Sequence, residues 1–293
     1  HLDYHKSMKN YLKAKLILFS NLLKKNCNIV TDNQIKEFKK LKEISKNRNL
    51  KLLTIGKKNS HIEINSVTIK NNNQRLYFKL NKKNYMVEIP LIGLFQINNL
   101  LMAVLAAKLS GLQIGILLKN IKKIREVSGR LQFIKNLSNG TKIFVDYAHT
   151  PDALESSLKA LKEHYGIKPD IVFGCGGERD KKKRPLMARV CEIHAEDIYL
   201  TDDNPRNENP KLIRSMIISG FKNPKRFHNI SLRSKAIKEA IINSKPNGIL
   251  LVAGKGHETI QVYKNKILNF SDKAIILKTK TRKLKYNKKN YNQ

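Results

Sequence analysis

The sequence predicts an α/β protein whose second half folds as a Rossmann-like domain with a mostly parallel sheet. Strand-like and helix-like segments alternate regularly from about residue 129 onward, which is typical of parallel strands joined by helical crossovers. The strand-like runs are continuous stretches rich in Val, Ile and Leu, as expected for strands covered on both faces. At 293 residues the chain is long enough for two domains, and we expect them at 1–128 and 129–293.

The second half is predicted element by element from these runs. The expected strands are KIFVDYA (142–148), DIVFGC (170–175), DIYLTDD (197–203) and GILLVAG (248–254). The expected helices are 151–165, in which Pro151 suits the first turn, 185–194, 210–220 and 231–244. We expect the runs 141–148 and 171–174 to be parallel neighbours in one sheet.

The first half has a less regular order. A helix is predicted at 8–23, with an apolar face formed by Met8, Tyr11, Leu12, Leu16, Phe19, Leu22 and Leu23. A short strand at 29–30, a second helix, several strands between 51 and 90, and an apolar helix at about 97–109 follow. Gly111 is expected just past the end of that last helix.

Composition restricts the class of protein. The net charge of +35 is open to two interpretations, nucleic-acid binding or a bias toward Lys, Asn and Ile along the whole chain. The lysines are spread evenly rather than gathered in a stripe, which favours the bias and predicts no nucleic-acid partner. No run of 18 apolar residues occurs, so no membrane span is expected. Three scattered cysteines indicate a reducing, cytoplasmic setting, and the start at His1 suggests a fragment or a processed product.

Four loops follow the predicted strands, where ligands of parallel sheets bind. The loop GCGGERDKKKRP (174–185) combines glycines, which allow close approach of a ligand, with Arg179 and Arg184, which suit carboxylates or phosphates. The alternative is a flexible loop of solvated lysines.

The loop TDDNPR (201–206) offers acceptors for an amine in Asp203 and Asn204 and a fork for a carboxylate in Arg206. These groups suit an amino acid, although Asn-Pro is also an ordinary turn signal. The loop AGKGHE (253–258) brings Lys255, His257 and Glu258 but does not satisfy the GxxxxGK[ST] pattern of a phosphate loop. The remaining loop, DYAHTPD (146–152), offers Asp146, Tyr147 and His149 just before a predicted helix.

Lys15 falls near the centre of the apolar face expected for the first helix. One interpretation is a lysine whose stem packs on the core while its amine reaches water. The other is a lysine turned toward a site, where burial or modification changes its charge. His1 and Asp3, just before this helix, are either metal ligands or capping residues.

Taken together, these segments resemble the Mur ligases, a family of ATP-dependent enzymes that add amino acids to peptidoglycan precursors. The motifs HLDYH, SGR, VDYAHTPDALE, VFGCGGERDKKKRPLMA, TDDNPR and VAGKGHE occur in the family's order and cover almost the whole chain. The resemblance implies the last part of the family's central ATP-binding domain at 1–128, followed by its C-terminal, amino-acid-binding domain at 129–293.

The resemblance also implies an activity. Within the family, the chain is most similar to members that add meso-2,6-diaminopimelate to UDP-N-acetylmuramoyl-L-alanyl-D-glutamate. In such an enzyme ATP and Mg²⁺ activate the D-glutamate carboxylate as an acyl phosphate, which the amine of diaminopimelate attacks. A cytoplasmic monomer with no nucleic-acid or membrane partner is implied.

Residue roles are implied by the matched positions. Lys15, as a carbamate, and His1 match metal-binding positions, and Lys15 and His149 match catalytic ones. The positions that match ATP contacts are Asn99, Arg130, Asp146 and Tyr147. The positions that match the diaminopimelate pocket are Arg179, Asp203, Asn204, Arg206, Gly254 and Glu258. Arg206 favours diaminopimelate over lysine.

The sequence departs from the family pattern in two ways. Gln96, Glu178 and Lys182 replace the family's usual Asn, Asp and a small residue. The family's glycine-rich phosphate loop and UDP-sugar domain would precede His1, so we expect the 293-residue chain alone not to turn over ATP. Alternatives are a basic nucleic-acid-binding protein, a folylpolyglutamate-type ligase, against which the DNPR and DYAHTP segments weigh, and an inactive remnant.

Overall fold

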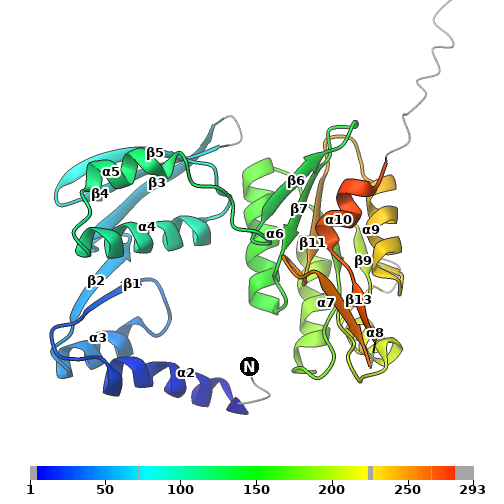
Figure 1. Cartoon of the computed structure of the whole chain (residues 1–293), viewed down its shortest axis with the longest axis horizontal. Helices are drawn as coiled ribbons and strands as arrows, with labels where there is room; N and C mark the ends of the chain where they lie inside the picture. Colours follow the sequence, from blue (N-terminus) through cyan, green and yellow to red (C-terminus); the bar gives the residue numbers. More distant parts are fainter. Residues whose placement is uncertain (1–4, 71–72, 224–226, 265, 281–293) are drawn as a thin grey trace, which may run out of the picture. The chain divides into compact units, whose positions relative to one another are not determined.

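The computed structural model describes residues 5–70, 73–223, 227–264 and 266–280, and it divides into two compact units at 1–126 and 127–293 (Figure 1). Each unit has its own sheet and its own hydrophobic core. Among the described residues no helix has the length and apolar character needed to cross a membrane. His1, predicted as a metal ligand, lies outside the described residues.

Unit 1 contains a five-stranded sheet in the order β1-β2-β3-β4-β5, parallel from β1 to β3 and antiparallel from β3 to β5. The strands are β1 (Asn28–Asp32), β2 (Lys51–Gly56), β3 (Ile62–Lys70), β4 (Asn73–Leu80) and β5 (Lys83–Ile89). The helices are α2 (Met8–Ile17), the π-helical η1 (Leu18–Leu22), α3 (Phe38–Asn47), α4 (Leu94–Leu109) and α5 (Ile114–Ile121). The predicted order is confirmed, and Gly111 follows α4 with φ +96°.

The apolar face predicted for the first helix is partly wrong. Leu16 is buried against β1 and α3, but the Met8 and Leu22 side chains are 65% and 69% exposed. Lys15 is exposed too, with its Nζ 4.7 Å from the centroid of the Tyr11 ring. Leu12, Phe19 and Leu23 pack partly against the same cluster as Leu16, so the predicted face is correct at these positions and wrong at Met8 and Leu22.

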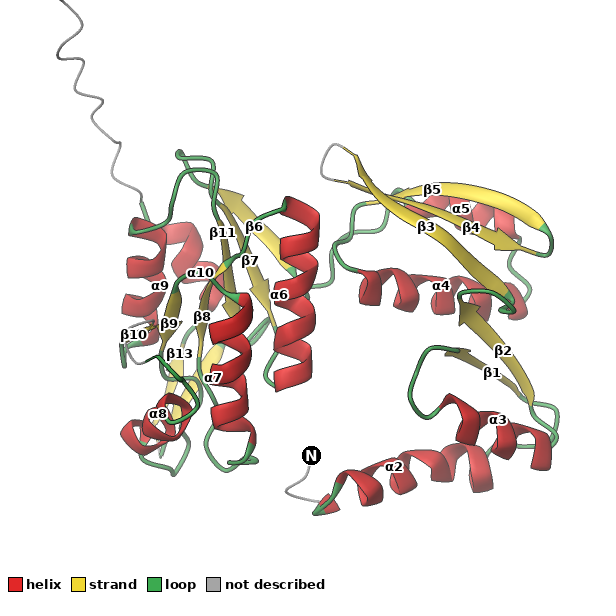
Figure 2. Ribbon diagram, turned by 180° about the vertical axis from the view of Figure 1, so that it is seen from behind, coloured by secondary structure: helices red, strands yellow, loops and turns green. Residues whose placement is uncertain are grey.

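Unit 2 is built on a six-stranded sheet in the order β10-β9-β8-β11-β7-β6, parallel except for β6 (Figure 2). The strands are β6 (Gln132–Asn136), β7 (Lys142–Asp146), β8 (Asp170–Phe173), β9 (Ile198–Leu200), β10 (Phe227–Asn229) and β11 (Ile249–Ala253). One face carries α6 (Pro151–Tyr165), α7 (Lys183–His194) and α8 (Pro210–Ile218). The other carries α9 (Arg233–Ile242) and α10 (Asp272–Lys278). The predicted α/β class with a mostly parallel sheet is confirmed.

The expectation that the first two parallel strands are neighbours is wrong. β11 lies between β7 and β8 and pairs in parallel with both of them. All five residues of β11 are buried, and such an apolar strand is most stable at the centre of the sheet. The carboxyl ends of β7, β8, β9 and β11 nevertheless meet at one edge, as the loops require.

Short elements escaped prediction. β10 has three residues, and the antiparallel hairpin of β12 (Ile260–Tyr263) and β13 (Lys266–Asn269) lacks an Asn-Gly or Gly-Gly turn signal. The hairpin is important because a backbone bridge joins Tyr263 to Arg206, which ties the hairpin to the loop after β9.

The buried Asp170, at the start of β8, is expected to lower stability at neutral pH. Burial raises the pKa of Asp170 to about 6, and the carboxylates of Asp197 and Glu196 add to the rise. The folded protein therefore binds more protons than the unfolded chain between pH of about 4 and 6, so this group's contribution to stability falls as pH rises through that window. Asp170→Asn should raise the thermal midpoint at pH 8 by about 2–4 °C, equivalent to about 1 kcal/mol, and much less at pH 4.5.

The check is thermal unfolding followed by circular dichroism at both pH values. The exposed Glu163→Gln on α6 is the matched control and should leave the midpoints within about 1 °C. An equal gain for Asp170→Asn at the two pH values would contradict the assignment.

Candidate functional site

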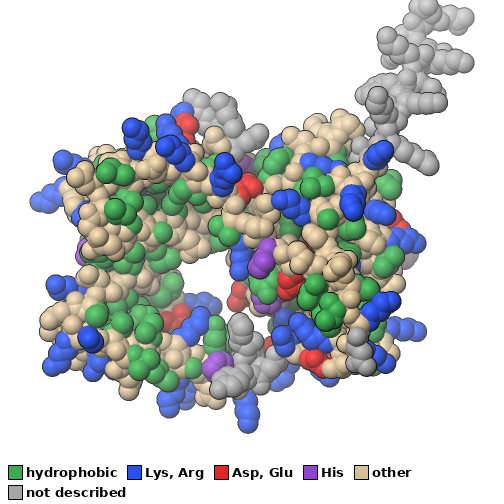
Figure 3. Space-filling model, viewed as in Figure 1, with side chains coloured by type: hydrophobic (Ala, Val, Ile, Leu, Met, Phe, Trp, Pro, Cys, Tyr) green, Lys and Arg blue, Asp and Glu red, His purple; other side chains and the backbone are tan. Residues whose placement is uncertain are grey.

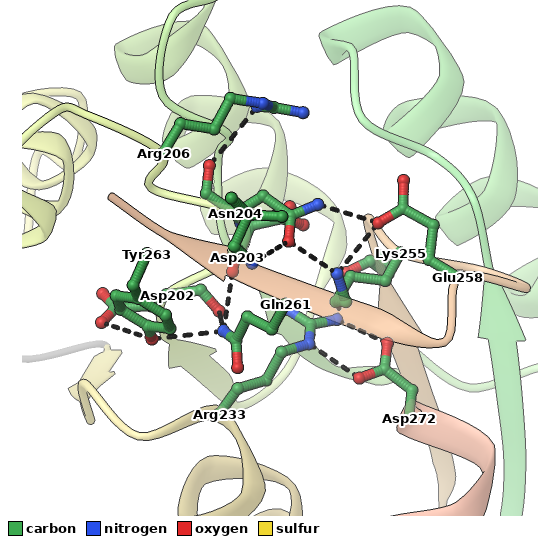
Figure 4. A network of polar contacts seen from close by, with 12 residues as sticks. Asp202, Asp203, Asn204, Arg206, Arg233, Lys255, Glu258, Gln261, Tyr263 and Asp272 are labelled. Atoms are coloured by element: carbon green, nitrogen blue, oxygen red, sulfur yellow. Dashed lines mark hydrogen bonds and ion pairs between the residues drawn. The ribbon is translucent and has the colours of Figure 1, made fainter. Parts of the chain in front are cut away.

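The side chains that the sequence singled out in unit 2 gather at the carboxyl edge of the sheet, on the loops after β7, β8, β9 and β11. Three of them form a network in which Asn204 comes from the β9 loop, and Lys255 and Glu258 come from the β11 loop (Figure 4). The Lys255 ammonium donates to Asn204 Oδ1 at 3.0 Å and to Glu258 Oε2 at 2.9 Å. Asn204 Nδ2 donates to the same Glu258 oxygen at 2.9 Å.

Asp203 and Gly254 bring the two loops into contact. Gly254 has φ +112°, and a Cβ built there would lie 2.7 Å from Asp203 Oδ2, so a larger residue would collide with the carboxylate. The Asp203 backbone is held as well, because its carbonyl accepts a hydrogen bond from Gln261 Nε2 of the hairpin at 2.7 Å. The Asp203 carboxylate is therefore fixed against β11, and the residue as a whole is 7% exposed.

Arg206 adopts a backbone conformation that is uncommon for a residue with a side chain, with φ +53°. Its backbone is clamped by the hairpin: its N–H donates to the Val262 carbonyl at 3.0 Å, and its carbonyl accepts from Lys264 N. Its Nη1 donates to the Gly177 carbonyl at 2.8 Å. Strained backbone that is over-determined by its surroundings is characteristic of ligand-binding positions.

The glycine-rich loop after β8 packs directly against the β9 loop. A Cβ at Gly177 would lie 1.8 Å from the Pro205 carbonyl oxygen, so this position excludes every other residue. Arg179, from the same loop, is exposed, and its Nη1 donates to the Glu178 carbonyl at 3.0 Å. The side chain is thus available at the surface of the loop.

Arg184 does not serve as the free ligand-binding group that the sequence suggested. It is 0% exposed and makes a two-pronged ion pair with Glu208, each N–O distance being 2.9 Å. Its Nη2 also donates to the Gly176 carbonyl at 3.3 Å. Arg184 therefore anchors the glycine-rich loop to the start of α8 from within the protein.

Loss of this anchor should be costly. Arg184→Met leaves the Glu208 carboxylate with only the exposed Lys181 ammonium, 4.0 Å away, and removing one member of a buried ion pair typically costs about 3–5 kcal/mol. Glu208 keeps some solvent, at 19% side-chain exposure, so the lower end is expected in urea unfolding. Arg189→Met, which removes a partly exposed ion pair on the same helix, should cost less than about 1 kcal/mol. Equal losses for the two variants would show that Arg184 is not an anchor.

A second cluster surrounds the Tyr147 ring at the end of β7. The Arg130 guanidinium lies 4.8 Å from the ring centroid, while the rings of His149 and His257 lie at 4.7 and 5.6 Å. His149 Nδ1 is hydrogen-bonded to the Tyr147 carbonyl at 2.8 Å. An aromatic face with several cationic or hydrogen-bonding groups around it fits a nucleotide, which presents a base and phosphates.

The Asp146 carboxylate accepts hydrogen bonds from other groups of this protein. One carboxylate oxygen accepts from the backbone N–H groups of Tyr147 at 2.8 Å and Leu131 at 3.2 Å, and the other accepts from the Ser157 hydroxyl. Burial raises the pKa of Asp146, against the lowering by these hydrogen bonds and by the charge of Arg130. Asp146 thereby holds the segment that carries Arg130 against the Tyr147 loop.

Two predicted positions lie in the other unit. Asn99, on α4, is exposed, whereas the neighbouring Gln96 is 7% exposed. Lys15 is on α2. Within the described part of the chain, no three His, Cys, Asp or Glu side chains converge to hold a metal ion.

Sequence reasoning named Lys255 without giving it a role, and it missed Gln261, Arg233 and Asp272. Arg233 and Asp272 form a completely buried, two-pronged ion pair with N–O distances of 2.7 Å, and Arg233 Nη2 also donates to the Ala253 carbonyl at 2.8 Å (Figure 4). No sequence signal marks such a pair, because its members are 39 residues apart.

Comparison with known proteins agrees with this arrangement. The Mur ligase middle-domain model matches residues 1–107, and the model of the Mur ligase glutamate ligase domain matches residues 129–256. The chain belongs to the Mur ligase family.

Figure 3 shows its Lys and Arg side chains scattered over the visible surface of both units rather than gathered in one stripe.

Among its relatives is the UDP-N-acetylmuramoyl-L-alanyl-D-glutamate–2,6-diaminopimelate ligase of Rickettsia montanensis, 44% identical over 280 residues, or 95% of this chain and 57% of that protein. The ligase of the same name from Haemophilus influenzae is 38% identical and matches 94% of this chain and 57% of its own length. The chain thus spans less than two thirds of the length of these curated relatives.

Solved structures of Mur ligases also match this chain. A structure of a UDP-N-acetylmuramoyl-L-alanyl-D-glutamate–2,6-diaminopimelate ligase matches with a TM-score of 0.61 at 32% identity, over 95% of this chain and 57% of that one. A MurF ligase from Thermotoga maritima in complex with ADP matches with a TM-score of 0.67 over 88% of this chain and 56% of that one. At 17% identity the second likeness concerns the fold alone.

Proposed function

We propose that this chain is part of an ATP-dependent ligase that adds meso-2,6-diaminopimelate to UDP-N-acetylmuramoyl-L-alanyl-D-glutamate in peptidoglycan synthesis, and that its second half binds the amino acid. The observation that carries the proposal is the pairing, at one sheet edge, of a clamped arginine with buried acceptor groups. Arg206 suits a carboxylate, and Asp203, Asn204 and Glu258 suit an amine. Diaminopimelate carries both groups at each of its ends. The names of the relatives support this substrate.

In this proposal the pocket fixes the far end of the amino acid. The Arg206 fork meets its carboxylate and the Glu258 carboxylate meets its ammonium, with Asn204 holding Glu258 through its Nδ2 at 2.9 Å and Arg179 at the rim. Holding one end of the ligand orients the amine at its other end for attack on the activated glutamate carboxyl, which lowers the entropic part of the barrier. Gly254 contributes by letting β11 approach Asp203 without a side chain between them.

ATP supplies the phosphoryl group that activates that carboxyl. Arg130, Tyr147 and His149 would contact the nucleotide, with Asp146 holding their segments in place. The proposal also assigns residues 1–128 to the end of the central ATP-binding domain and residues 129–293 to the C-terminal domain. Mg²⁺ bound with the nucleotide would neutralise the charge of its phosphates.

We also propose that Lys15 reacts with carbon dioxide to give a carbamate, the form in which it and His1 would bind magnesium. Its exposed amine is accessible to a small reagent. Exposure to ¹³CO₂ should give a carbamate carbon resonance that Lys15→Met abolishes and Lys13→Met does not. A resonance that survives Lys15→Met would refute the assignment.

The proposed substrate can be tested by titration calorimetry on the purified chain, because the pocket lies within unit 2. Meso-diaminopimelate is expected to bind saturably, and L-lysine on the order of 100-fold more weakly, since lysine leaves Arg206 without a carboxylate. Equal affinity for both, or strong salt-dependent binding of random nucleic acid without diaminopimelate binding, would overturn the proposal.

A further inference from the structure

Lys255 is a completely buried cation at the centre of the polar network on the β9 and β11 loops, with a side chain that is 0% exposed. Burying an ammonium is costly unless hydrogen bonds and an opposite charge replace the lost water. Here both are present, since Nζ donates to Asn204 Oδ1 and to Glu258 Oε2. Of the two residues that receive these bonds, Glu258 is the one proposed to meet the amine of the ligand, and Asn204 holds Glu258.

The first consequence concerns the amide of Asn204. Its Oδ1 receives the Lys255 ammonium at 3.0 Å and the Val262 backbone N–H at 3.1 Å, and neither donor can accept a hydrogen bond. The oxygen of the amide must therefore face Lys255, and Nδ2 must face Glu258. Lys255 in this way removes the two-fold ambiguity of the amide.

The second consequence concerns Glu258. Its Oε2 receives both Lys255 Nζ and Asn204 Nδ2, each at 2.9 Å. Figure 4 shows the other oxygen, Oε1, turned away from Lys255 and Asn204. One oxygen thus holds the carboxylate in place, and the other is left for a further donor, such as the ammonium of a ligand.

The neighbouring carboxylates have other cations. Asp202 is paired with Arg214 and accepts from the Tyr263 hydroxyl at 3.1 Å, while Asp272 is paired with Arg233. Among the described residues, Lys255 forms an ion pair with Glu258. Its ammonium is therefore directed to Glu258 and not to Asp202 or Asp272.

We propose that Lys255 is a positioning residue for recognition of the ligand's far amine: its buried ammonium sets the orientation of the Asn204 amide and turns Glu258 Oε1 to the ligand. The proposal rests on the proposed function, because it assumes that diaminopimelate occupies this pocket. It assigns Lys255 no contact with the ligand's carboxylate, which belongs to Arg206.

The test compares two ligands on the complete 293-residue chain by titration calorimetry. Meso-diaminopimelate carries the far amine, and L-2-aminopimelate keeps the far carboxylate but lacks that amine. Lys255→Met should weaken diaminopimelate binding on the order of tenfold or more, since charge-assisted hydrogen bonds are lost, and leave aminopimelate binding within about twofold. Lys245→Met, the same change at an exposed lysine paired with Glu196, should alter neither.

Equal weakening for both ligands would mean that Lys255 only holds the fold together, and unchanged binding of both would mean that it has no role. If Lys255→Met does not fold, as circular dichroism would reveal, Lys255→Gln keeps one donor for Asn204 and should show the same selective loss to a smaller extent. Absence of diaminopimelate binding by the unaltered chain would overturn the proposed function and this proposal with it, whereas normal binding followed by a non-selective loss overturns this proposal alone.

Discussion

Replacing Arg206 by alanine is expected to weaken meso-diaminopimelate binding on the order of 100-fold or more while changing L-lysine binding far less. The two amino acids differ by the carboxylate at the far end of diaminopimelate, which a guanidinium meets with two charge-assisted hydrogen bonds. Truncating one partner of such a buried charge pair typically costs about 2–5 kcal/mol, and each 1.4 kcal/mol is tenfold. Titration calorimetry on the chain measures both affinities.

The positive φ of Arg206 makes a second variant informative. Glycine adopts φ +53° without strain, so Arg206→Gly removes the side chain and relieves the backbone, whereas Arg206→Ala keeps the strain. If the Arg206 side chain binds the carboxylate of the ligand, both variants should lose diaminopimelate affinity to a similar extent. Arg189→Ala, on the exposed side of α7, should have no effect. Recovery of affinity in Arg206→Gly, or equal losses for lysine, would mean that Arg206 shapes the loop and does not select the substrate.

Arg233→Met should be the most destabilising substitution in unit 2, at about 3–5 kcal/mol. The variant leaves Asp272, which is 0% exposed, as a buried charge without a partner, and it removes the hydrogen bond from Nη2 to the Ala253 carbonyl at the end of β11. Urea unfolding at constant pH gives the free energy of unfolding for comparison with the unaltered chain.

Two further variants separate the charge from the packing. Lys235→Met breaks only a surface pair with Glu239 and should cost less than about 1 kcal/mol. Arg233→Met combined with Asp272→Leu removes both charges and should recover a large part of the loss, since an apolar pair needs no compensation. A double variant as unstable as Arg233→Met alone would show that packing, rather than the unpaired carboxylate, governs the effect.

The fold class could be predicted from the sequence because parallel strands buried on both faces consist of continuous apolar runs. The run 249–253 is the clearest example, and it is buried at every position. Its place in the sheet could not be predicted in the same way. Strand order depends on which strand gains most from being central, and that is a comparison between distant segments. The hairpin at 260–269 was missed because a short, partly exposed ribbon has little apolar pattern.

The candidate site could likewise be predicted only in part. The closeness of Asp203, Asn204, Arg206, Gly254 and Glu258 could be predicted, because their loops follow predicted strands and strand ends meet at one edge. What each side chain touches could not be read from the loops. Arg184 looked like a ligand-binding group and is an internal anchor, whereas Lys255 looked unremarkable and is the hub of the network. Spacing along the chain does not tell which of several nearby charges pair with each other.

The central claim is tested most directly by product formation in a protein in which this chain replaces the matching part of the Rickettsia montanensis relative. Mass spectrometry would follow UDP-N-acetylmuramoyl-L-alanyl-D-glutamate incubated with ATP, Mg²⁺ and meso-diaminopimelate. The account predicts ATP-dependent addition of one diaminopimelate through an amide, much faster than addition of L-lysine, and abolished by Arg206→Ala. Phosphate release without an amide product, or equal addition of lysine, would contradict it.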